Sequence, residues 1–119
     1  MNRKLLALLM AAITLPAAAA QYVKPGAILT LHPGQNNAKF NINASTGDGS
    51  GVCNMEGTAQ QIAAGENQKH RWVWNDNTSQ CVAVISELHN GNASIMTRGC
   101  KGYCGASAAG AMDGLFNKK

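Results

Sequence analysis

Apolar and polar residues alternate along several short segments of this chain. Phe40, Ile42 and Ala44 are separated by asparagines, and the same alternation follows over residues 53–57. A period of two is typical of a β-strand that buries one of its faces. By alternation or by β-branched composition, the segments predicted to form short strands are 40–44, 53–57, 69–75 and 82–88.

Turn-forming residues separate the predicted strands. Residues 46–51 read Thr-Gly-Asp-Gly-Ser-Gly and residues 75–79 read Asn-Asp-Asn-Thr-Ser, and both compositions are typical of loops. Residues 60–68 fit a loop or a single helical turn. No apolar stripe of helical period runs far enough to build a bundle. We therefore predict an all-β fold, a small antiparallel sheet closed into a barrel or sandwich.

The first 20 residues have the pattern of an export signal. A basic start at Arg3 and Lys4 precedes an apolar run from Leu5 to Leu15, and alanines occupy positions 17–20. This pattern predicts cleavage before Gln21, and the apolar run is too short to span a bilayer. We expect a periplasmic or secreted protein without a membrane span. Its predicted parts are a signal peptide (1–20), an extended lead-in (21–37) and a β-domain (38–119).

All four cysteines follow the predicted signal, at positions 53, 81, 100 and 104. An even number of cysteines in a short exported domain is typical of a disulfide framework rather than a redox or metal site. We therefore predict that two disulfides cross-link the β-domain. Each is worth roughly 2–4 kcal/mol, a substantial share of the net stability of a small domain.

A hairpin turn suggests how these cysteines pair. The Asn90-Gly91 dipeptide lies between two strand-like segments and predicts a type I′ turn, which needs positive φ at both central residues. In that register Ile85 lies opposite Met96, and Cys81 lies opposite Cys100 on the same face. The prediction is therefore a Cys81–Cys100 disulfide.

The remaining two cysteines then form Cys53–Cys104 by elimination. A second set stays open, in which Cys53 pairs with Cys81 and a small ring joins Cys100 to Cys104.

Charge and spacing argue against several classes of function. After residue 20 there are eight Lys and Arg against six Asp and Glu, and this small, scattered charge does not describe a nucleic-acid surface. Cys100 and Cys104 have three residues between them, whereas thioredoxin-like motifs and zinc knuckles have two. The histidines, at positions 32, 70 and 89, are dispersed surface candidates, and no carboxylate pair stands out. We expect no enzyme activity, no cofactor, no metal and no nucleic-acid partner.

Trp72 and Trp74 lie two residues apart and share one face of a predicted strand. Beside Arg71 they could form a stacking platform for sugars. Because the chain has only two Phe, two Trp and two Tyr, we favour a place in the core for both tryptophans.

The segment Cys100-Lys101-Gly102-Tyr103-Cys104-Gly105 is the most site-like part of the chain. Its cysteines would constrain the loop, and Lys101 and Tyr103 would be presented outward around Gly102. A constrained loop that displays a cation and an aromatic ring is a candidate binding site, because little entropy is lost when it binds. The alternative is a cross-linked strand end with no partner.

Cysteines and glycines recur in a set order over residues 51–116. Gly51–Gly57 reads Gly-x-Cys-x-x-x-Gly, Cys81 follows in an apolar strand, Cys100–Gly105 reads Cys-x-x-x-Cys-Gly, and Asp113-Gly114 comes shortly before an aromatic residue. In this order the chain resembles small bacterial periplasmic lysozyme-inhibitor-like proteins of the LprI type.

The loop also resembles the disulfide-closed inhibitory loop of the Ivy-type lysozyme inhibitor. Cys100, Lys101, Cys104 and Gly105 match that loop, whereas this chain has one residue fewer between the cysteines and lacks its His. The resemblance implies a periplasmic inhibitor of a lysozyme or another peptidoglycan-cleaving enzyme, acting through Lys101, Gly102 and Tyr103. The alternative is a non-enzymatic cell-envelope binding or assembly module.

Overall fold

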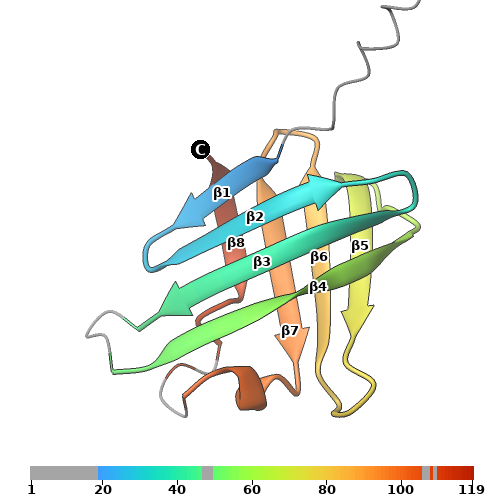
Figure 1. Cartoon of the computed structure of the whole chain (residues 1–119). Coiled ribbons are helices and arrows are strands. Elements are labelled where there is room, and N and C mark those ends of the chain that lie inside the picture. The colour runs from blue at the N-terminus through green and yellow to red at the C-terminus, as the bar shows by residue number, and fades with distance from the viewer. Residues whose placement is uncertain (1–18, 47–49, 106–107, 109) are drawn as a thin grey trace, which may run out of the picture.

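The structure is a computed structural model that describes residues 19–46, 50–105, 108 and 110–119. Within these residues, eight antiparallel strands form a closed barrel in which each strand pairs with the next and β8 pairs with β1 (Figure 1). The elements are β1 (Ala20–Lys24), β2 (Ala27–Pro33), β3 (Asn37–Ser45), β4 (Val52–Ile62), β5 (Gln68–Asn75), β6 (Val82–Leu88), β7 (Ala93–Arg98), the 3₁₀ turn η1 (Lys101–Tyr103) and β8 (Gly114–Lys118). The prediction of an all-β barrel cross-linked by two disulfides is confirmed.

Alternation places one face of each strand inside the barrel. In β3 the side chains of Phe40, Ile42 and Ala44 are buried, and in β4 those of Cys53 and Met55 are buried. The asparagines between them face solvent, and the Asn41 amide donates to Glu56 across the two strands at 3.2 Å. The period-two pattern therefore predicts these strands correctly.

The predicted lead-in over residues 21–37 is wrong. These residues form β1 and β2, and β2 pairs with β3 along its whole length, from Ala27↔Ala44 to Pro33↔Ala38. Leu29 and Leu31 contribute to the core at 0% and 1% exposure. The β-domain thus begins at Ala20. Most of the predicted signal, residues 1–18, lies outside the described residues.

The turn between β6 and β7 has one residue more than predicted. The N–H of Gly91 donates to the Leu88 carbonyl at 3.0 Å, and the N–H of Leu88 donates to the Asn92 carbonyl at 2.8 Å. The loop therefore comprises the three residues 89–91, with Gly91 in the left-handed region at a φ of 94°. This is the arrangement of a three-residue hairpin rather than of a type I′ turn.

The extra residue shifts the β6–β7 register by one. Ile85 lies opposite Ile95, not opposite Met96. A shift of one residue moves every side chain of a strand to the other face. Ile95 is therefore buried, whereas Met96 faces outward and is 66% exposed.

Both predicted disulfides, Cys81–Cys100 and Cys53–Cys104, are present, and the alternative set is absent from the described residues. The predicted β6–β7 ladder does not account for the Cys81–Cys100 disulfide. The β6–β7 ladder ends at Val82↔Arg98, so its continuation would place Gly99 opposite Cys81. Gly99 takes a left-handed φ of 70°, and this turn of the chain brings the next residue to the cysteine.

Large side chains fill the barrel interior. Trp72 is 2% exposed, and Trp74 is partly buried and packs against the same core. A Cβ added to Gly57 would lie 2.5 Å from Trp74 Nε1, so the missing side chain of Gly57 provides the space for this ring. The core interpretation of both tryptophans is confirmed, and they form no exposed platform.

Residues 99–105, 108 and 110–113 lie at the end of the barrel at which β4 and β5 separate. These two strands pair only over Gln60–Ile62 and Arg71–Val73. Beyond that short ladder, Cys104 forms an isolated antiparallel bridge with Cys53, and the N–H of Gly105 donates to the Val52 carbonyl at 3.2 Å. The chain after η1 therefore lies along the start of β4 (Figure 1).

Candidate functional site

The candidate loop is held at both of its ends by disulfides. Cys100 bonds to Cys81 just before β6, and Cys104 bonds to Cys53 in β4. Between them, η1 is closed by hydrogen bonds of 3.0 Å from the N–H of Tyr103 to the Cys100 carbonyl and from the N–H of Cys104 to the Lys101 carbonyl. The loop is thus a compact turn fixed to two strands of the barrel.

Lys101 is exposed, as predicted, and forms the tip of this loop together with Gly102. A Cβ placed on Gly102 would have no atom within 4 Å, so the space around the tip is open. The backbone of Gly102 is therefore open to close approach, next to the exposed Lys101.

Tyr103 does not point outward, and the prediction that it is a free contact residue is wrong. The residue is half-buried, its hydroxyl donates to the Asp76 carboxylate, and its ring meets the ring of Trp74 edge-on at a centroid distance of 5.8 Å. Tyr103 therefore anchors the loop to the barrel end and leaves Lys101 and Gly102 as the exposed tip.

Asp76 holds this anchor through several hydrogen bonds. Its carboxylate accepts bonds from Tyr103, from the N–H and hydroxyl of Thr78 at 2.9 and 2.7 Å, and from the Ser79 hydroxyl at 3.0 Å. These bonds, that from Tyr103 above all, hold the pKa of Asp76 well below its usual range, and the same bond raises the pKa of Tyr103. A charged Asp76 thus ties the β5–β6 loop to the candidate loop.

A hollow of about 160 Å³ lies beside Lys101. Lys101 lines it together with Thr97, Met112 and Asp113, and with Gly99, Gly110 and the two cysteines of the loop. Asp113 Oδ1 accepts hydrogen bonds from the N–H and hydroxyl of Thr97 at 2.8 and 2.7 Å, which fixes the carboxylate in place. The hollow is large enough for a small polar group of a partner.

Sequence reasoning finds the loop tip but misses the two aspartates around it. In the sequence Asp76 is recognisable only as part of a polar turn, although the Thr78 and Ser79 that follow it are the residues expected to bond such a carboxylate locally. For Asp113 the only signal in the sequence is the Asp-Gly pair of the resemblance. No sequence pattern links Asp76 to Tyr103 or Asp113 to Lys101, because tertiary structure brings each pair together.

The opposite end of the barrel carries a histidine–carboxylate pair. His70 Nδ1 lies 2.8 Å from Glu87 Oε1, and the His70 ring stacks on Trp72 at 5.7 Å. Burial, with a smaller effect of the Glu87 charge, raises the pKa of Tyr22.

His32 and His89 are exposed, as predicted, whereas His70 is half-buried. Among the described residues, no group of three or more His, Cys, Asp or Glu could hold a metal ion.

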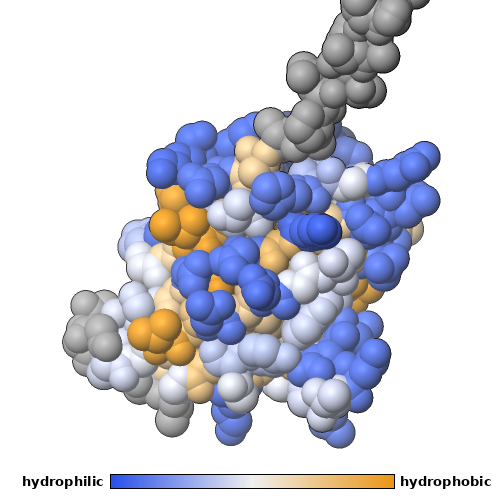
Figure 2. All heavy atoms as spheres, in the orientation of Figure 1, coloured by the Kyte–Doolittle hydropathy of each residue, from blue (hydrophilic) through white to orange (hydrophobic). Residues whose placement is uncertain are grey.

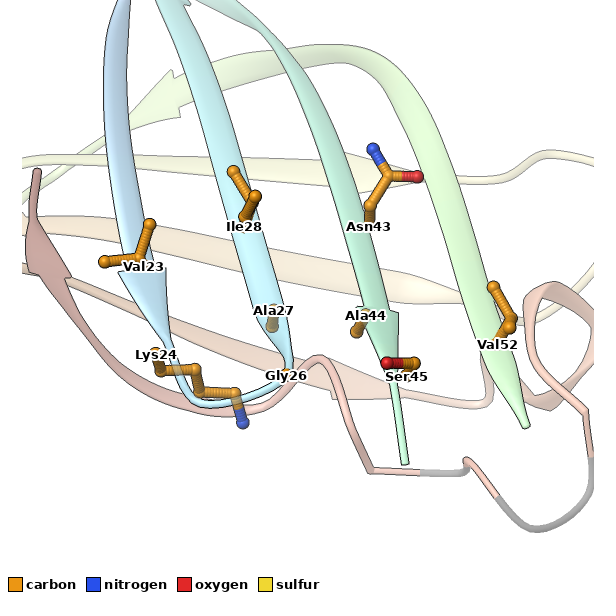
Figure 3. A pocket seen from close by; sticks show the side chains of 9 residues that line it. All are labelled: Val23, Lys24, Gly26, Ala27, Ile28, Asn43, Ala44, Ser45 and Val52. Carbon is orange, nitrogen blue, oxygen red and sulfur yellow. The ribbon is translucent and has the colours of Figure 1, made fainter. Parts of the chain in front are cut away.

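A shallow groove of about 500 Å³ crosses the outer face of β1–β4 (Figure 3). Val23, Ile28, Asn43 and Val52 stand on four neighbouring strands along it (Figure 3). Hydrophilic residues cover much of this side of the molecule and hydrophobic ones form separate patches (Figure 2). Lys24, which also lines the groove, already has interaction partners. Its ammonium donates to the Asp113 carbonyl and lies 5.4 Å from the Phe116 ring centre. The lining offers apolar contact rather than acid–base groups.

No protein-family model, curated protein or solved structure matches this chain. None of the described residues forms a helix long and apolar enough to cross a membrane.

Proposed function

We propose that this protein is an exported inhibitor of a lysozyme or another peptidoglycan-cleaving enzyme, and that Lys101 and Gly102 enter the partner's active-site cleft. One observation carries the proposal. The exposed Lys101 lies on a short turn that disulfides fix to the barrel on both sides. Export, and with it a periplasmic or secreted location, is part of the proposal.

A fixed loop suits this role for energetic reasons. A turn already held in one conformation loses little entropy on binding. The clefts of glycoside hydrolases carry two carboxylates, and an ammonium group that reaches them forms a desolvated ion pair. The open space around Gly102 lets the backbone approach the cleft wall, and the hollow beside Lys101 can receive a group from its rim.

Long-range electrostatics would act against binding to a basic lysozyme. The part of the chain after residue 20 carries eight Lys and Arg against six Asp and Glu, so two positive molecules would repel each other at a distance. Salt screens such repulsion. Association should therefore become faster as ionic strength rises, while the affinity rests on short-range contacts at the tip.

A lysozyme turbidity assay tests the proposal. Residues 21–119 are purified with disulfides intact and titrated in micromolar excess against lysozyme acting on bacterial cells, and we expect slower lysis. Lys101→Ala should weaken inhibition about 30-fold or more, because losing one partner of a desolvated charge pair costs about 2–5 kcal/mol. Lys118→Ala, which removes an exposed lysine from β8, is the matched control and should inhibit like the wild type. Unchanged lysis at micromolar excess of the wild type would contradict the proposal.

The second candidate is a non-enzymatic cell-envelope binding or assembly module. Exposed apolar side chains on the outer barrel face favour it, among them Met96 at 66% and Val52 at 59% exposure. This function predicts no effect on lysis and a partner protein that crosslinks to the barrel wall rather than to the Lys101 tip.

A further inference from the structure

The outer face of β5, β6 and β7 combines apolar and basic side chains. These strands lie side by side (Figure 1), and the register aligns Val73, Val84 and Met96 in one outward row. We call this surface, formed by the outward side chains of Arg71, Val73, Val82, Val84, Met96 and Arg98, the β5–β7 face. A groove of about 300 Å³ runs over it.

Two arginines stand at opposite corners of the β5–β7 face. Arg71 is on β5 opposite Ser86, and Arg98 is on β7 opposite Val82. Both line the groove, and neither has an ion pair or a side-chain hydrogen bond within the described part of the chain. The outward positions of the three strands contain no carboxylate. The face is therefore positive and uncompensated.

Arg71 is already partly removed from water. Its Nε atom is buried and has no hydrogen-bond partner among the described residues. Ser86, its cross-strand neighbour, is only 3% exposed although alternation places it on the outer face. Neighbouring side chains therefore cover Ser86 on this face. A buried guanidinium N–H without an acceptor costs free energy. The Nη groups of Arg71 are not among the buried atoms, so they are accessible to an incoming carboxylate.

We propose that the β5–β7 face binds an extended acidic–apolar segment of a partner protein. Partner carboxylates bond to Arg71 and Arg98, and an apolar side chain between them packs on Val84 and Met96. Arginine and methionine are enriched in protein interfaces, and arginine is frequent at their hot spots. The groove crosses three neighbouring strands, which suits an extended segment of a partner rather than a compact ligand.

The spacing of the two arginines suits such a segment. Arg71 and Arg98 are two strands apart, and the row of Arg71 is four residues from Arg98 along β7. At about 4.8 Å per strand and about 3.3 Å per residue, the offsets are roughly 10 Å and 13 Å. A five-residue extended peptide with a glutamate at each end spans about 13 Å along its backbone, and the flexible arginine side chains cover the remainder.

The inference is independent of the proposed inhibitor function, because it uses a different surface. The probe is the capped peptide Glu-Leu-Val-Leu-Glu, titrated into ¹⁵N-labelled protein and followed by amide chemical shifts, with Gln-Leu-Val-Leu-Gln as the matched peptide. We expect shifts on β5, β6 and β7 with the glutamate peptide, and binding that is weaker at high salt. Arg71→Gln and Arg98→Gln should each weaken binding about tenfold, because a charge-assisted hydrogen bond is lost.

Variants on two surfaces complete the test. Met96→Asp should abolish peptide binding, whereas Val52→Asp places the same charge at an exposed apolar residue elsewhere and should not. Lys101→Ala should leave peptide binding unchanged, and Met96→Asp should leave any inhibition of lysis unchanged. Dispersed amide spectra establish that each variant is folded.

Four results would overturn the inference. They are no shifts at millimolar peptide, equal binding of the glutamine peptide, shifts confined to the Lys101 loop, and a dimer of the free protein in sedimentation that Met96→Asp dissociates. The last would make the face a contact between copies of this chain.

Discussion

At the scale of single residues, Tyr103 decides what the candidate loop displays. Its hydroxyl bonds to Asp76 and its ring packs on Trp74, so the turn is held by a hydrogen bond and an aromatic contact in addition to its two disulfides. Lys101 and Gly102 remain exposed because Tyr103 takes the inward position of the same turn. The exposed part of the candidate site thus consists of one cation and the backbone beside it.

Tyr103→Phe should remove the hydrogen bond and keep the ring contact. The pKa of Asp76 lies below its ordinary value of 3.8 in the folded protein, and the Tyr103 bond is the largest cause. A group with a lowered folded pKa stabilises the fold above its unfolded pKa, and this stability is lost as pH falls through the folded pKa. We therefore expect the wild type to be more stable than the variant at pH 6. This advantage should shrink as pH falls through the pKa that Asp76 has in the folded variant, which lies below 3.8.

Urea unfolding at a series of pH values measures this difference. An NMR titration of the Asp76 carboxyl provides the second readout. In the variant its pKa should rise but stay below 3.8, because Thr78 and Ser79 still donate to the carboxylate. A stability difference that stays constant from pH 6 to pH 2 would show that the bond to Tyr103 does not set the titration of Asp76.

The sequence predicts the tip of this site and not its anchor. A Cys-x-x-x-Cys segment with glycines identifies a constrained loop, and Lys101 is exposed as expected. The inward position of Tyr103 depends on Asp76, which lies 27 residues earlier in the chain. Propensity and alternation describe neighbours in sequence, so they contain no information about such a pair.

At the scale of elements, alternation predicts a strand wherever polar residues separate the buried ones. It fails for β2, in which Ile28 is apolar yet 42% exposed, so the period of two is hidden. Pro33 ends the same strand and makes it look like a turn. The predicted register of β7 is wrong for another reason. One extra residue in the turn before β7 exchanges the inward and outward faces of this strand. The β5–β7 face, which depends on an outward Met96, is therefore visible only in the structure.

The two disulfides should differ in their contribution to stability. Cys53–Cys104 closes a segment of 51 residues and Cys81–Cys100 one of 19. In the chain-entropy description, the longer closure is worth about 4 kcal/mol and the shorter about 3 kcal/mol. Replacing both members of a pair with alanine should therefore cost more for Cys53 and Cys104 than for Cys81 and Cys100, measured by urea unfolding under non-reducing conditions.

The same variants test how the loop is held. Cys53 and Cys104 join η1 to β4, so their loss should also increase hydrogen exchange at the amides of residues 103 and 104, which close the turn. The Cys81–Cys100 variant retains that link and should show a smaller increase at these amides. Equal exchange in both variants would indicate that Tyr103 and Asp76 alone fix the turn.

At the scale of the whole molecule, the barrel is closed by its last strand. β8 pairs with β1 through Tyr22↔Lys118 and Val23↔Asn117, and with β7 through three further pairs. These two short ladders provide few backbone hydrogen bonds. The side chain of Phe116, which is 0% exposed and points into the core, must therefore contribute much of the closure.

Phe116→Ala and Leu115→Ala compare the two faces of this closing strand. Phe116 is fully buried, and replacing a buried phenylalanine with alanine costs about 3–5 kcal/mol because apolar contact is lost and a cavity remains. Leu115 is 54% exposed on the opposite face, and its replacement should change the free energy of unfolding by less than about 0.5 kcal/mol. Urea unfolding followed by tryptophan fluorescence measures both. Phe116→Ala should also increase hydrogen exchange at Tyr22 and Val23, because β1 loses the strand that it pairs with. If both changes lowered the free energy of unfolding by the same small amount, the packing of the barrel core would not depend on β8.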